Sequence, residues 1–102
     1  MMIRLNEDDI ESIKNAFTST FESSDELWIF GSRVDPNRKG GDIDLYIKTR
    51  EHDLDEIMKL KISFHLKLDS FLGERKIDII INAGTQHLDI YDIAETTGVR
   101  LV

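Results

Sequence analysis

The sequence predicts an α/β protein of the α+β type, in which helices pack against one small mixed β-sheet. Two stretches, 42–48 and 76–81, alternate apolar and polar residues as strands do. Two others, 6–21 and 54–72, repeat apolar residues every three or four positions, as amphipathic helices do. The length of 102 residues suits one domain, which we expect to span residues 1–102.

The first helix is predicted to begin at Asn6, which can cap it, while the acids of 7–9 favour the positive helix end. Four apolar residues then share one helix face: Ile10, Ile13, Phe17 and Phe21. The next segment, 26–30, is short, apolar and aromatic, and Gly31 follows it. This segment is predicted to be a buried strand with Trp28 in the core.

A loop is predicted from Val34 to Gly41, a stretch that contains a proline and glycines. The strand 42–48 follows, and its alternation separates two faces. One face carries Ile43, Leu45 and Ile47, and the other carries Asp42, Asp44 and Tyr46. The strand 76–81 repeats this pattern, with Asp78 among isoleucines.

The segment 54–72 fits two patterns. A helical face would contain Ile57, Leu60, Phe64, Leu68 and Phe71, whereas a strand-like alternation would contain Leu60, Ile62, Phe64, Leu66 and Leu68. A run this long without glycine or proline favours a helix, and Gly73 stands where a helix C-cap belongs. Near the end, 88–96 is predicted to be a helix and 99–102 a short strand.

Composition excludes several classes of function. The chain has no cysteine, so disulfides, zinc–thiolate sites and thiol catalysis are excluded. It has no apolar run long enough to span a membrane and no signal-like N-terminus, so we expect a cytoplasmic protein. The formal net charge of −7 disfavours direct nucleic-acid binding but is compatible with a basic partner protein or with a nucleotide accompanied by Mg²⁺.

Acidic residues on the predicted strands indicate a metal site. Asp42 and Asp44 share a strand face with their Cα atoms about 6.6–7 Å apart. Without a cation their carboxylates repel by about 1–4 kcal/mol at a separation of about 4 Å. If the strand of Asp78 is adjacent, three acids can hold two divalent ions, which would stabilise an in-line phosphoryl displacement. Asp78 could also act as a general base.

A glycine and a serine follow the first strand and suit phosphate binding. Gly31 permits close approach of the backbone to a ligand, and Ser32 can present its hydroxyl and amide groups to phosphate oxygens. Arg33 could add positive charge against a triphosphate. Taken singly, the acids fit an exposed strand face and the Gly-Ser pair fits an ordinary turn. Their order along the chain favours a common site.

Two other motif interpretations fail. The stretch 31–41 lacks the Gly-Lys-Ser/Thr of a Walker A loop. The stretch from Asp35 resembles the start of an EF-hand loop, but Lys39 replaces an oxygen ligand and Tyr46 stands at the position of the bidentate glutamate.

The three-part pattern resembles the signature of the DNA polymerase beta-like nucleotidyltransferase superfamily. The matching residues are Gly31-Ser32, then Asp42-Ile43-Asp44-Leu45, then Asp78 on a later strand. Gly31-Ser32-Arg33 and the short chain are most similar to the minimal nucleotidyltransferases, the MNT antitoxins. Gly41 and Pro36 depart from residues common in that family, but neither departure removes an expected ligand.

The resemblance implies roles beyond those derived from the residues. Asp42, Asp44 and Asp78 would be the catalytic acids and metal ligands, and Gly31, Ser32 and Arg33 would bind the nucleotide. The cofactor would be Mg²⁺, as two ions, with ATP as the substrate. The partner would be a HEPN-domain toxin, silenced by transfer of AMP onto a hydroxyl, expected to be a tyrosine.

Two alternatives remain open. The chain could neutralise its toxin sterically, with catalysis dispensable, or it could modify a small molecule as antibiotic-modifying relatives do. The exposed edges of a small sheet would also suit a homodimer or a heteromeric complex.

Overall fold

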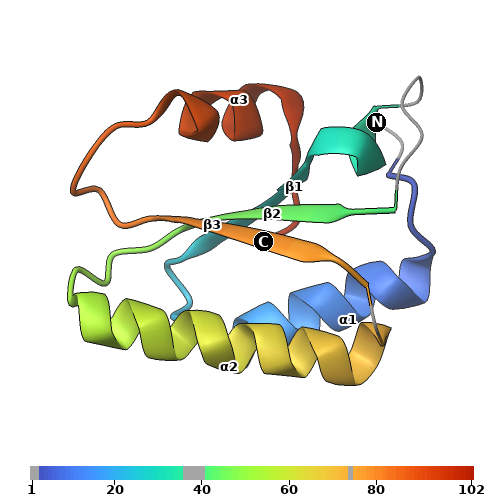
Figure 1. Ribbon diagram of the computed structural model, residues 1–102, viewed down its shortest axis with the longest axis horizontal. Coiled ribbons are helices and arrows are strands. Elements are labelled where there is room, and N and C mark those ends of the chain that lie inside the picture. The colour runs from blue at the N-terminus through green and yellow to red at the C-terminus, as the bar shows by residue number, and fades with distance from the viewer. Residues whose placement is uncertain (1–2, 36–40, 74) are drawn as a thin grey trace.

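The computed structural model of the chain describes residues 3–35, 41–73 and 75–102. Figure 1 shows one sheet with helices on both sides, which confirms the predicted α+β class with one small mixed sheet. The elements are α1 (Glu7–Thr18), β1 (Glu26–Phe30), the 3₁₀ helix η1 (Gly31–Val34), β2 (Ile43–Lys48), α2 (Leu54–Leu72), β3 (Ile77–Asn82), α3 (Asp89–Thr97) and β4 (Val99–Arg100). The loop predicted from Val34 to Gly41 begins inside η1, and its residues 36–40 lie outside the described residues.

The strands are arranged in the order β3-β2-β1-β4. β1 pairs antiparallel with β2 and β4, whereas β2 and β3 are parallel. Parallel neighbours need a long crossover connection, and α2 provides it. β2, β3 and α3 each begin one residue later than predicted, and β4 ends at Arg100 rather than Val102.

The main core lies between the sheet and the layer formed by α1 and α2. The strand β2 contributes fully buried residues, as its alternation predicts: Ile43, Leu45 and Ile47. The ring of Phe64 from α2 contacts the rings of Phe17 and Phe21 edge-on. α1 ends at Thr18, before Phe21, but Phe21 is still buried because its ring stacks on Phe17 with the centroids 5.0 Å apart.

The opposite face of the sheet packs on α3. Its buried cluster consists of Trp28, Phe30, Tyr46, Tyr91 and Ala94. Trp28 is 7% exposed, so its predicted place in the core is confirmed. Asp44 lies on this same face, two residues before Tyr46. Among the described residues, no helix is long and apolar enough to cross a membrane.

Candidate functional site

Acidic side chains from two parallel strands lie next to each other at the start of β2 and β3. In the β2–β3 register, Asp44 is the direct partner of Asp78. Neighbouring strands are about 4.8 Å apart and paired residues share a face, so both carboxylates extend from one face of the sheet. Asp42 precedes Asp44 by two residues, so the alternation directs its side chain to that face as well. The three acids therefore lie at one end of one sheet face.

A lysine lies beside the first of these acids. The amide of Ile43 donates a hydrogen bond of 3.0 Å to the carbonyl of Lys76. The hydrogen bonding between β2 and β3 therefore extends to Lys76, the residue before the first partner in the register, Ile77. The Lys76 Nζ is 3.7 Å from Asp42 Oδ2, and both side chains are more than half exposed. An exposed pair of this kind contributes little stability. The ammonium can therefore be displaced from Asp42 at small cost.

The acids are of the chemical type that binds a divalent cation, but their side chains are not gathered around one point. Within the described ranges, no three His, Cys, Asp or Glu side chains are grouped closely enough to hold a metal ion. Three carboxylates on neighbouring strand positions nevertheless supply the oxygen ligands that Mg²⁺ prefers. The in-register pair Asp44 and Asp78 brings like charges together, and a cation would offset their repulsion. The assignment of Asp42, Asp44 and Asp78 as metal ligands therefore stays a prediction from the sequence.

Gly31 lies directly against one of the acids. Its φ is +76°, a conformation that L side chains rarely adopt. A Cβ built on Gly31 would lie 2.2 Å from Asp44 Oδ2, well inside van der Waals contact. The sequence predicted that Gly31 permits close approach of a ligand. The structure adds a second reason, because the Asp44 carboxylate occupies the space that any side chain at position 31 would need.

Ser32 and Arg33 lie in η1, and their side chains bond to the backbone of segments before and after it. The Ser32 hydroxyl donates a long hydrogen bond of 3.5 Å to the Asp42 carbonyl. The Arg33 guanidinium donates to the carbonyls of Arg4 (2.8 Å) and Gly41 (2.9 Å). Arg4 in turn donates from its guanidinium to the Ser32 carbonyl. These bonds brace the turn that carries Gly31, and the predicted phosphate-binding roles of Ser32 and Arg33 remain predictions.

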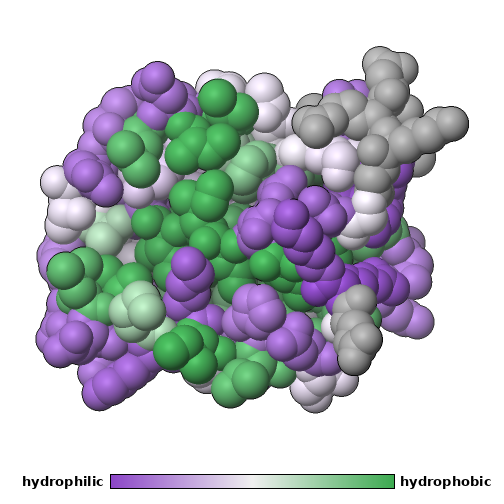
Figure 2. Space-filling view, viewed as in Figure 1, coloured by the Kyte–Doolittle hydropathy of each residue, from purple (hydrophilic) through white to green (hydrophobic). Residues whose placement is uncertain are grey.

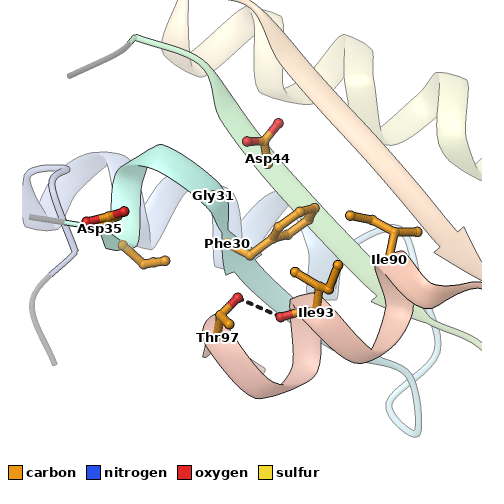
Figure 3. Close-up of a pocket in the computed structure, with 8 residues that line it drawn as sticks. Phe30, Gly31, Asp35, Asp44, Ile90, Ile93 and Thr97 are labelled. Carbon is orange, nitrogen blue, oxygen red and sulfur yellow. Dashed lines mark hydrogen bonds between the residues drawn. The ribbon is translucent and has the colours of Figure 1, made fainter. Parts of the chain in front are cut away.

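An open pocket of about 490 Å³ lies beside the acids. It is lined by Phe30, Gly31, Val34, Asp35, Asp44, Ile90, Ile93 and Thr97. Figure 3 shows Asp35 beside η1, Asp44 on β2, and Ile90 and Ile93 on α3, with Phe30 among them. A pocket lined by both carboxylates and apolar side chains suits a ligand that has a charged part and a flat or apolar part.

Tyr46 lies on the sheet face that packs on α3, two residues after Asp44 in β2. Its side chain is fully buried, and its hydroxyl donates to Glu95 Oε2 (2.8 Å) and accepts from Asn82 Nδ2 (3.0 Å). Burial raises the pKa of the Tyr46 phenol from 10.0 to about 12; the Asn82 hydrogen bond lowers that pKa, and the hydrogen bond and charge of Glu95 raise it. Tyr46 is therefore a neutral structural link between β2, β3 and α3.

The raised pKa predicts an alkaline loss of stability. The neutral phenol is favoured in the folded state, so its contribution is fully present below about pH 10 and is lost as the pH rises to about 12. A pKa difference of that size between the folded and unfolded states corresponds to about 2–3 kcal/mol in the free energy of unfolding. We expect the free energy of unfolding, measured with urea, to fall more steeply between these pH values for the wild type than for Tyr46→Phe. Parallel profiles would contradict this role.

Sequence reasoning missed three side chains that shape the site. Lys76 was predictable in part, because the alternation of β3 puts it on the face of Asp78. Asp35 lines the pocket and Arg4 braces η1, but neither carries a sequence signal, since both depend on how irregular segments fold.

One comparison with known proteins identifies the family. No curated protein matches the chain at a significant level. The family model described as "Nucleotidyltransferase domain" matches residues 10–99, which include the pocket, η1, β2 and β3. This match covers most of the chain and confirms the predicted nucleotidyltransferase superfamily. The chain therefore belongs to the nucleotidyltransferase domain family.

Proposed function

We propose that this chain transfers AMP from ATP onto a hydroxyl, expected to be a tyrosine, of a HEPN-domain toxin and thereby acts as its antitoxin. The observation that carries the transfer chemistry is the β2–β3 register, which pairs Asp44 with Asp78 beside Gly31 and the pocket. The antitoxin role is supported by the resemblance of Gly31-Ser32-Arg33 to the minimal nucleotidyltransferases. The net charge of −7 is compatible with a basic partner.

The proposed reaction is an in-line displacement at the α-phosphorus. The acceptor hydroxyl oxygen forms a bond to phosphorus while the bond to the oxygen bridging to the β-phosphate breaks, and pyrophosphate leaves. The hydroxyl proton passes to a carboxylate. Asp78 is the best acceptor for it, because its side chain is exposed and can reach an acceptor group that arrives from solvent.

The other residues position and neutralise the substrate. A bound divalent cation would supply charge neutralisation on the triphosphate, held by Asp42, Asp44 and Asp78. Lys76, once displaced from Asp42, has an exposed ammonium free to contact a phosphate oxygen. The apolar wall of Ile90 and Ile93 would pack against the nucleobase or the acceptor ring.

The test is a labelling experiment with the product of the neighbouring reading frame, which should be a small helical protein with an Arg-x-x-x-x-His motif. The purified pair is incubated with α-³²P-labelled ATP and Mg²⁺, and the partner is examined by intact mass. We expect the mass of AMP on a hydroxyl residue. Asp42→Asn should lower labelling by at least about 100-fold, since even outer-shell partners of a metal are worth about 10–100-fold.

The matched control is Asp55→Asn, which removes an exposed acid from α2 on the other side of the sheet and should label normally. Undiminished labelling by Asp42→Asn would refute the assigned site. Labelling only with another nucleoside triphosphate would refute ATP as the donor. If Asp42→Asn fails to label but still neutralises the toxin in cells, the steric alternative is correct.

A further inference from the structure

The Arg33 side chain bonds to the backbone of two segments that are distant in sequence. Its Nη1 donates to the Arg4 carbonyl (2.8 Å), and its Nη2 donates to the Gly41 carbonyl (2.9 Å). The Arg4 amide in turn donates to the Arg33 carbonyl (2.7 Å). The third guanidinium nitrogen, Nε, is buried and has no hydrogen-bond partner among the described residues. One arginine therefore ties the segment before α1 to the residue that precedes Asp42.

The pocket does not include Arg33 in its lining. η1 is a 3₁₀ helix, in which residues three positions apart share a face. Gly31 and Val34 are such a pair, and both belong to the described residues that line the pocket, whereas Arg33 does not. Because Nε is also buried, the fork of N–H groups that includes Nε cannot face a phosphate in the pocket. The contacts of Arg33 thus favour a role toward the backbone over a role toward the nucleotide.

Three consecutive residues at the start of β2 are each held by a different segment. The Gly41 carbonyl accepts from Arg33, and the Asp42 carbonyl accepts the long bond of 3.5 Å from Ser32. The Ile43 amide donates to the carbonyl of the residue before β3. Figure 2, drawn in the view of Figure 1, shows mainly hydrophilic residues around the end of the sheet where β2 and β3 begin. Water competes for backbone hydrogen bonds at such a strand end, so a charged donor there is valuable, because its hydrogen bonds are stronger than those between neutral groups.

We propose that Arg33 is a positioning residue, which fixes the backbone at Gly41 and thereby places the Asp42 carboxylate for nucleotidyl transfer. The inference rests on the proposed function, because the position of Asp42 affects transfer only if the chain carries out that reaction. It gives Arg33 this role in place of the predicted phosphate contact. A guanidinium suits the role, because its N–H groups lie in one rigid plane and can donate to two carbonyls at once.

Amide hydrogen exchange of the whole chain, measured by NMR, tests the brace without any substrate. The amides of Ile43 and Thr49 lie at opposite ends of β2, and each donates a hydrogen bond of 3.0 Å to a carbonyl in or next to β3. Arg33→Met removes both side-chain bonds, so we expect exchange at Ile43 to rise by about 10-fold or more relative to exchange at Thr49. Unchanged exchange at Ile43 would overturn the proposal. Equal acceleration at both amides would also overturn it, because Arg33 would then support the whole fold rather than the start of β2.

The kinetics of partner labelling separate positioning from phosphate contact. We expect Arg33→Met to lower kcat by about 10- to 100-fold and to leave the KM for ATP nearly unchanged, because a misplaced Asp42 impairs the chemical step. A higher KM with unchanged kcat would indicate a phosphate contact and would overturn the proposal. The control is Arg50→Met, which removes the same charge from an exposed arginine beyond the other end of β2 and should match the wild type in exchange and kinetics. A wild type that labels no partner would refute the proposed function and with it the transfer role of Arg33, whereas the exchange of Ile43 would still test the brace.

Discussion

Gly31→Ala is expected to abolish nucleotidyl transfer while the chain stays folded. The new Cβ would lie 2.2 Å from Asp44 Oδ2, so the carboxylate must leave its position. A misplacement of about 1 Å at a reacting centre can cost about 100-fold in rate, and this collision moves a predicted metal ligand by at least that much. The measurement is the initial rate of partner labelling from labelled ATP, together with thermal unfolding of the variant.

Gly73→Ala is a matched control for the backbone strain. Gly73 has a φ of +74°, close to the +76° of Gly31, but no heavy atom lies within 4 Å of an added Cβ. Both variants should lose stability by about 1–3 kcal/mol, because alanine is strained in this conformation. Only Gly31→Ala should lose transfer. If the two variants label their partner equally well, the contact between position 31 and Asp44 has no catalytic role.

Much of the fold was predictable because its local patterns are strong. α2 was predicted with its observed bounds, since apolar residues recur every three or four positions in a stretch without glycine or proline that ends at Gly73. β2 was predicted because apolar and polar residues alternate without interruption. The end of α1 was less predictable, because Phe21 continues the helical spacing but is buried from a turn after Thr18. Phe21 therefore has the spacing of a residue on the helix face, although it packs on Phe17 from outside the helix.

The sequence predicted the acids of the site and the strands that carry them, but not which strands are neighbours in the sheet. Alternation along β2 places Asp42 and Asp44 on one face, but it says nothing about the neighbouring strand. The order β3-β2-β1-β4 and the parallel register are set by non-local packing, and they determine that Asp78 lies opposite Asp44. A register shift of one residue would have turned Asp78 to the other face.

Asp78→Asn is expected to raise stability and to abolish transfer. Asp44 and Asp78 are direct partners in the parallel β2–β3 register, and two like charges near solvent repel by about 1 kcal/mol at about 4 Å. Neutralising Asp78 removes that repulsion, so the free energy of unfolding without metal should rise by a similar amount. The same change removes the proposed proton acceptor and one proposed metal ligand, so labelling should fall to background. Functional sites often trade stability for activity in this way.

Urea unfolding with and without Mn²⁺ separates the two effects of Asp78. A cation that binds only the folded chain stabilises it, so the wild type should gain stability with Mn²⁺ and Asp78→Asn should gain much less. Glu22→Gln is the control, because it removes one negative charge at an exposed position outside the sheet. If Glu22→Gln raises the metal-free stability as much as Asp78→Asn does, the gain comes from the net charge of −7 and not from the carboxylate pair. If Asp78→Asn instead lowers the metal-free stability, the paired acids do not repel, and a metal is no longer needed to explain why two aspartates occupy adjacent strands.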